Sequence, residues 1–162
     1  MSDTGTHRTL EVTTPSETTV AMTRRFAAPR ALVFDAFTKP ALVTRWLLGP
    51  DGWTMPVCEI DLRAGGAYRY RWRSDDGERE FGVAGTYREV VPPERIVHTE
   101  KMDGMPGEAV ATTTFVERDG ETIVTMTIDY GSRGVRDIAL ESGMTGGVEA
   151  SFGRLERTVL QR

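Results

Sequence analysis

Cysteine and histidine are scarce in this 162-residue chain, which holds one cysteine and two histidines. The single Cys58 excludes a disulfide bond within the chain. Cysteine and histidine also never cluster at the short spacings that metal ligands require, so we expect no metal and no other cofactor.

Long apolar runs are also missing. No segment approaches the ~20 consecutive apolar residues of a membrane span, and the first 19 residues lack the apolar stretch of a signal sequence. We therefore expect a cytoplasmic protein without membrane contact. The 20 basic and 24 acidic residues give a net charge of −4, which excludes the general basic surface of a nucleic-acid-binding protein. With 39% apolar residues, the chain has enough for one domain with its own core.

The segment 132–160 carries a narrow apolar stripe at helical spacing. The stripe residues recur every three or four positions and are Met144, Val148, Phe152, Leu155 and Val159. Interior glycines cost a helix about 1 kcal/mol each relative to alanine, and this segment holds several, so packing must stabilise it. Val135, Ile138 and Ala139 lie on a different side when the helix is continued backwards, which predicts a break near Ser142–Gly143.

Most of the remaining chain alternates apolar and polar residues with the period of a strand. Asp76-Gly77 and Asp119-Gly120 are the sharpest turn signals between these segments. The alternation predicts an antiparallel sheet of about seven strands, which is too wide to stay flat. We expect residues 1–17 to form a mobile tail, in which Leu10 and Val12 could add a short edge strand, and residues 18–162 to form one domain. The predicted strands are 18–26, 53–62, 67–74, 81–91, 95–101, 109–117 and 122–130.

Two prolines mark the starts of two short helices between the first and second strands of the sheet. Pro29 and Pro40 suit the first helical position, where the missing N–H would be unpaired in any case. The second helix, over 41–48, ends at Gly49-Pro50-Asp51-Gly52. The predicted fold is α+β, with a curved sheet around a long C-terminal helix and a space between the two.

Four stretches of sequence are familiar in combination. They read FAAPRALVFDAFTKPALVTRWLLGPDGW, CEIDLRAGGAYRYRW, YREVVPPERIVHTE and ESGMTGGVEASFGRLERTVL. Together they resemble the SRPBCC (START-like, Bet v-like) superfamily, in its bacterial branch of heat-shock-protein-90 ATPase activator homologues. The resemblance implies the helix-grip fold, a bent antiparallel sheet wrapped around a C-terminal helix with a cavity between them. Superfamily members bind hydrophobic small molecules, cyclise or aromatise polyketides, or contact a chaperone.

One predicted strand separates aromatic from basic side chains. Tyr68, Tyr70 and Trp72 share one face, and the arginines between them share the other. The aromatic face could line a ligand cavity or simply pack in the core. Because the arginines lie on the opposite face from the rings, nucleic-acid binding is not expected.

Other candidates for the cavity follow from alternation and from loop position. Trp46 and Trp53 flank the 49–52 loop, where they could gate a cavity or seal the helices to the sheet. The flexible side chain of methionine suits a lining that accepts several ligand shapes. The candidate cavity residues are Trp46, Trp53, Tyr68, Tyr70, Trp72, His98, Phe115, Met126, Met144, Val148 and Phe152.

Few residues have side chains that are suited to catalysis. His98 shares a strand face with Glu100, a pair able to transfer a proton, yet no nucleophile or metal ligand accompanies it. We therefore assign no catalytic residue and read Cys58 as inert. Glu59 and Asp61 share one strand face, and the pattern leaves open whether that face is inside or outside.

The leading hypothesis is a START-like domain that holds a hydrophobic small molecule between helix and sheet. A chaperone-activator module is an alternative, although the eukaryotic activators carry an extra N-terminal domain and only about 17 residues precede the first predicted strand here. A cyclase or aromatase is the second alternative and would require His98, Glu59, Asp61, Tyr68 or Tyr70 to converge inside the cavity. A homodimer is plausible on general grounds.

Overall fold

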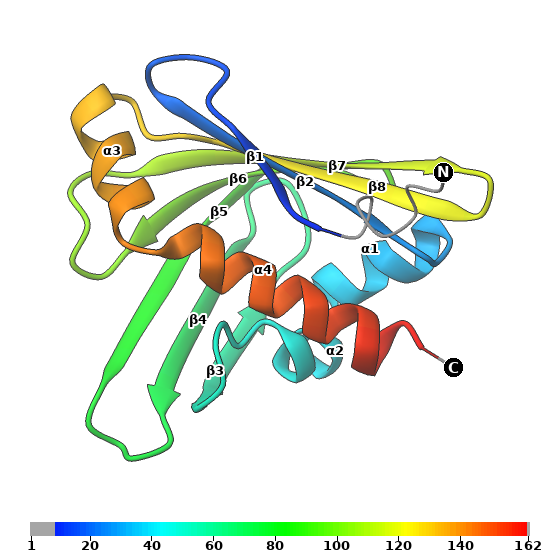
Figure 1. Ribbon diagram of the computed structural model, residues 1–162, viewed down its shortest axis with the longest axis horizontal. Coiled ribbons are helices and arrows are strands. Elements are labelled where there is room, and N and C mark those ends of the chain that lie inside the picture. The colour runs from blue at the N-terminus through cyan, green and yellow to red at the C-terminus, as the bar shows by residue number, and fades with distance from the viewer. Residues whose placement is uncertain (1–8, 162) are drawn as a thin grey trace.

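The computed structural model describes residues 9–161 and is built on one antiparallel sheet of eight strands (Figure 1). The strands follow the order β1-β2-β8-β7-β6-β5-β4-β3, so β3 to β8 are successive hairpin neighbours. The sequence predicts about seven strands, and the eighth is the short edge strand β1, in which Val12 pairs with Met22. The strands are β1 (Glu11–Thr13), β2 (Thr19–Phe26), β3 (Trp53–Ile60), β4 (Ala67–Ser74), β5 (Glu80–Val91), β6 (Arg95–Met102), β7 (Ala109–Arg118) and β8 (Glu121–Asp129).

Two short helices follow β2, and a longer helical segment ends the chain. The helices are α1 (Arg30–Thr38), α2 (Pro40–Trp46), α3 (Arg133–Glu141) and α4 (Met144–Arg154), and α4 continues as one π-helical turn, η2 (Leu155–Val159). The predicted break is confirmed, because Gly143 separates α3 from α4 with a φ of 84° that suits glycine. No helix among the residues the structure describes is long and apolar enough to cross a membrane.

The C-terminal helix crosses one face of the sheet, and α3 lies toward one end of it (Figure 1). Phe152 and Leu155 of the predicted stripe are buried, with 1% and 0% of their surface exposed. The Phe152 ring meets the edge of Phe26 from β2 at a centroid distance of 5.4 Å. The amphipathic helix therefore packs on the inner face of the sheet, which is the helix-grip arrangement.

Polar anchors hold this helix at its C-terminal end. The Arg154 guanidinium donates to the carbonyl oxygens of Trp46 (3.2 Å), the last residue of α2, and of Gly49 (3.0 Å), in the loop that follows. The largely buried pair Arg24 and Glu156, 3.1 Å apart, ties η2 to β2. At the other end of the helical segment, the Arg136 guanidinium of α3 donates to the Ser16 carbonyl oxygen at 2.9 Å, in the connection between β1 and β2.

Candidate functional site

Aromatic side chains of β4 cover part of the inner face of the sheet. Tyr68 and Tyr70 lie with their ring centroids 5.0 Å apart, and Tyr68 is only 3% exposed. The Trp72 indole N–H donates to the Leu47 carbonyl at 2.7 Å and so joins the sheet to the loop after α2. The predicted aromatic face is therefore turned inward, and these rings also serve as packing.

His98 lies beside this aromatic group on the same face. It pairs in register with Tyr87 of β5, and its ring meets Tyr68 edge-on at 5.1 Å. The imidazole Nε2 is 3.9 Å from the Glu100 carboxylate, as their shared strand face predicts. The imidazole Nδ1 is buried without a hydrogen-bond partner among the residues the structure describes.

The tyrosine hydroxyls of this face are held in their neutral form. Burial is the main cause that raises the pKa of Tyr68 and Tyr70 above the ordinary value, and it raises the pKa of Tyr87 to about 12. Burial also raises the pKa of Tyr130, with the Glu100 charge as the second cause. These phenols act as hydrogen-bond donors near neutral pH and are poor candidates for a base.

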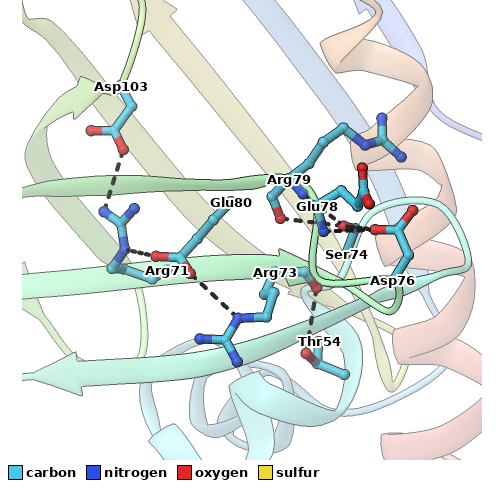
Figure 2. Close-up of polar contacts among 9 residues, drawn as sticks. All are labelled: Thr54, Arg71, Arg73, Ser74, Asp76, Glu78, Arg79, Glu80 and Asp103. Atoms are coloured by element: carbon cyan, nitrogen blue, oxygen red, sulfur yellow. Dashed lines mark hydrogen bonds and ion pairs between the residues drawn. The ribbon is translucent and has the colours of Figure 1, made fainter.

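The arginines of β4 point to the opposite, outer face, where acidic residues neutralise them (Figure 2). Arg71 pairs with Glu80 at 2.9 Å and with Asp103 at 3.3 Å. Arg73 pairs with the second oxygen of Glu80 at 3.4 Å. This face is a network of ion pairs.

The orientation of the two β3-side carboxylates, which the sequence leaves open, is outward. Glu59 faces Arg69 at 3.8 Å, and its side chain is 69% exposed. Asp61 pairs with Arg63 at 3.0 Å and is half exposed. Neither carboxylate joins the aromatic group on the inner face, so two of the five groups that a cyclase would need lie elsewhere.

A pocket of about 290 Å³ opens between the inner face of the sheet, the β6–β7 loop and the junction of α3 with α4. We call it the α3–α4 pocket. Its walls are mostly apolar and include Phe81, Met102, Met105, Ala109, Val135 and Met144. Its polar groups include the Tyr130 side chain and the carboxylates of Glu100 and Glu108.

The eleven predicted cavity residues divide among three locations. Met144 lines the α3–α4 pocket, and the rings of Trp53 and Trp72 contact its Phe81 wall at 5.5 and 5.0 Å. Tyr68, Tyr70 and His98 form the adjacent aromatic group. The other five lie in or against the two core clusters and are Trp46, Phe115, Met126, Val148 and Phe152.

Sequence reasoning did not identify the β6–β7 loop or α3 as walls of a pocket. The loop sequence, Asp103 to Gly107, carries only the signal of a turn. Glu108 and Val135 have no distinctive pattern around them. The amphipathic break at Gly143 was the available signal, because it places α3 against one end of the sheet.

A second hollow of about 470 Å³ lies at the start of α1, beside Pro29 and Leu160. Its carboxylate, Glu156, already accepts hydrogen bonds from Arg24 and from the Ala27 backbone N–H. It therefore offers less to a ligand than the α3–α4 pocket. Within residues 9–161, no three acidic, histidine or cysteine side chains gather as metal ligands.

Comparisons with known proteins agree with this architecture. Residues 27–159 match the family model described as Activator of Hsp90 ATPase homolog 1-like protein. No curated protein sequence matches the chain.

Solved structures extend the comparison. A Rhodobacter sphaeroides protein is 30% identical with a TM-score of 0.87, over 92% of this chain and 96% of its own. A Chromobacterium violaceum protein is 26% identical with a TM-score of 0.79, over 91% of this chain and 100% of its own. An HSP90 activator from Plasmodium falciparum, 21% identical over 86% of this chain and 94% of its own, shares the fold with a TM-score of 0.61. Folds of this kind serve as ligand-binding or interaction modules in general. The chain belongs to the family of Activator of Hsp90 ATPase homolog 1-like proteins.

Proposed function

We propose that this protein binds a small apolar molecule in the α3–α4 pocket. The observation that carries the proposal is the pocket itself, with its volume of about 290 Å³ and its mostly apolar wall. This volume is near the lower end of the range for ligand sites. At roughly 30 Å³ per water-sized group, it accepts a ligand of about ten such groups.

The lining supports a site that tolerates several ligand shapes. Met102 and Met105, at the end of β6 and in the turn after it, meet Met144 of α4 at this pocket. Methionine has an unbranched, polarizable side chain that repacks around different shapes. The Tyr130 side chain on the same wall adds a hydroxyl that can orient a ligand.

Binding without catalysis accounts best for the polar groups nearby. His98 and Glu100 could transfer a proton, but Tyr68 is committed to the Thr99 carbonyl at 2.7 Å. A cyclase or aromatase needs both an acid and a base placed against the substrate. We therefore keep the cyclase or aromatase activity as the second alternative. Turnover of a polyketide substrate by the purified protein would establish it.

Two variants on one helix test the site. Val135→Trp places a large ring in the pocket, whereas Ile138→Trp on the same helix α3 replaces a side chain that is 46% exposed and lies outside the pocket wall. A ligand that binds only the folded protein raises its melting temperature. In a thermal-shift screen of apolar compounds, we expect hits that stabilise the parent and Ile138→Trp but not Val135→Trp. Hits that stabilise all three proteins equally, or no hits at all, would contradict the proposal.

A chaperone-binding module is the alternative function, supported by the family description and by the fold shared with the Plasmodium activator. The measurement is a pull-down with purified Hsp90. Recovery of Hsp90 at near-equal stoichiometry would favour this alternative, and recovery that Val135→Trp leaves unchanged would separate it from the pocket.

A further inference from the structure

We propose that the ligand of the α3–α4 pocket is a hydrophobic cation, namely an apolar body that carries a protonated amine. This inference rests on the proposed function and names the ligand class that the charges of the pocket select. It follows from the sign and burial of the charged groups on the pocket wall and around it.

The wall carries negative groups only. Its ionisable residues with a charge at neutral pH are Glu100, Asp103 and Glu108, and no lysine, arginine or histidine lines it within residues 9–161. Asp103 is already neutralised, because its carboxylate accepts from Arg71 at 3.3 Å (Figure 2). The same carboxylate accepts from the Gly82 backbone N–H at 3.0 Å. Two carboxylates therefore remain to set the charge of the site.

Of these two carboxylates, Glu100 has the stronger electrostatic effect on the pocket. Its side chain is only 21% exposed, so the solvent screens its charge less than that of a surface carboxylate. Within residues 9–161, the basic side chain paired with it is His98, at 3.9 Å, and His98 is charged only when protonated. With a neutral imidazole, the carboxylate has no matched charge among the residues the structure describes.

Glu108 adds a second negative charge close by, since it precedes Ala109, the residue of β7 that pairs with Glu100 of β6. It is exposed and forms no ion pair within the described part of the chain. The charges of Glu100 and Glu108 both contribute to raising the pKa of Tyr68 in the adjacent aromatic group, after burial as the main cause. Their fields add at the pocket and do not cancel.

Such a site discriminates by charge. A carboxylate that is largely withdrawn from water attracts an ammonium group and repels a second carboxylate. Phe81 and Tyr130 on the same wall are aromatic, and aromatic rings also favour a cation. A hydrogen bond to a charged partner contributes enough to change affinity by roughly tenfold or more.

The test uses three probes that each carry a phenyl ring on a four-carbon chain. Phenylbutylamine, phenylbutanol and phenylbutanoate end in an ammonium, a hydroxyl and a carboxylate group, and each has about the size the pocket accepts. Binding to the full chain is measured by calorimetry at about pH 8, where the free amine probe is protonated and the free carboxylate probe is ionised. We expect the amine to bind roughly tenfold tighter than the alcohol, and the carboxylate to bind more weakly than both.

Substitution of single glutamates by glutamine identifies the carboxylate that causes the preference for the amine. Glu100→Gln should reduce the preference for the amine over the alcohol to within about twofold, and Glu108→Gln should reduce it partly. Glu59→Gln changes the net charge equally but alters only an exposed pair on the outer face, so it should leave the preference unchanged. If Glu100→Gln does not fold, as judged by circular dichroism, Glu108→Gln carries the test.

The outcomes separate this inference from the proposed function. If the amine binds no tighter than the alcohol, or if only the alcohol or the carboxylate binds, the cation inference is wrong and the proposed apolar site still stands. If no probe binds at any concentration tested, both the site and the inference are wrong. A preference for the amine that survives Glu100→Gln and Glu108→Gln would also overturn the assignment.

Discussion

The Tyr68 hydroxyl donates a hydrogen bond of 2.7 Å to the Thr99 carbonyl oxygen, across the intervening strand β5 at Gly85. Gly85 allows the Thr99 carbonyl to lie this close to β5, because a Cβ atom at position 85 would lie 2.0 Å from that carbonyl oxygen. The inner wall beside the pocket therefore depends on three residues from three strands.

Gly85→Ala should be strongly destabilising. The added methyl group clashes with backbone of the neighbouring strand, which cannot move as a flexible side chain does, and we expect a loss of about 3 kcal/mol in the free energy of unfolding. Gly134→Ala is the control, since a Cβ there meets open space within helix α3 and should stabilise by about 0.5–1 kcal/mol. Urea denaturation of both variants measures the difference. Equal effects would contradict the close approach at Gly85.

Tyr68→Phe keeps the ring and removes the hydroxyl. The Thr99 carbonyl then loses its buried donor, at a cost of about 1–3 kcal/mol. The melting temperature of the variant gives this loss directly, with a shift of roughly 2–4 °C per kcal/mol for a chain of this size. A shift within error of the parent would show that the hydroxyl is dispensable.

Arg24 and Glu156 form a buried pair at 3.1 Å that joins β2 to the end of the C-terminal helix. Arg24→Met leaves the Glu156 carboxylate buried without this partner and should cost about 3 kcal/mol. The double variant Arg24→Met with Glu156→Leu removes both charges and should be less destabilised than the sum of the two single variants by at least about 1 kcal/mol. Additive losses in this double-mutant cycle would show that the two charges are not coupled.

Cys58 should react slowly at alkaline pH. Burial, with the Glu59 charge as the second cause, raises the pKa of its thiol from 9.0 to about 11. At pH 8 the thiolate fraction is then about 100-fold smaller than in the unfolded chain, and alkylation by iodoacetamide should slow in proportion. Because the pKa is raised on folding, the neutral thiol favours the folded state below pH 9, and this stabilisation is lost as the pH rises toward 11. Equal rates of alkylation with and without denaturant would refute the shift.

Much of the fold could be predicted from the sequence because its signals are local. The alternation from Ala67 to Ser74 predicts β4 with its observed bounds, and Gly143 marks the observed helix break. Pro40 occupies the first position of α2 as predicted, whereas Pro29 is the N-cap residue just before α1 and not its first helical residue. Local spacing does not predict the π-helical turn Leu155–Val159, which forms where Glu156 is held by Arg24.

The candidate site was less predictable, because it joins segments that are far apart in the chain. Alternation places Tyr68 and His98 on the inner face, but it does not say which part of that face is filled. The pocket is enclosed by Val135 and Met144 together with the β6–β7 loop, a combination set by the position of α3 after the break at Gly143. Trp46 was a predicted cavity residue but lies in the core. Its indole N–H donates to the Ala36 carbonyl at 2.9 Å, and the residue is 1% exposed.

The most direct test of the ligand site uses the methionine methyl groups as reporters. Met102, Met105 and Met144 line the α3–α4 pocket, whereas Met22, Met55 and Met126 do not. In a methyl NMR titration of the full chain with phenylbutylamine, we expect the signals of the first three to shift together and saturate with one affinity. Shifts confined to Met22, Met55 or Met126, or no saturable shift at any methionine, would contradict the account.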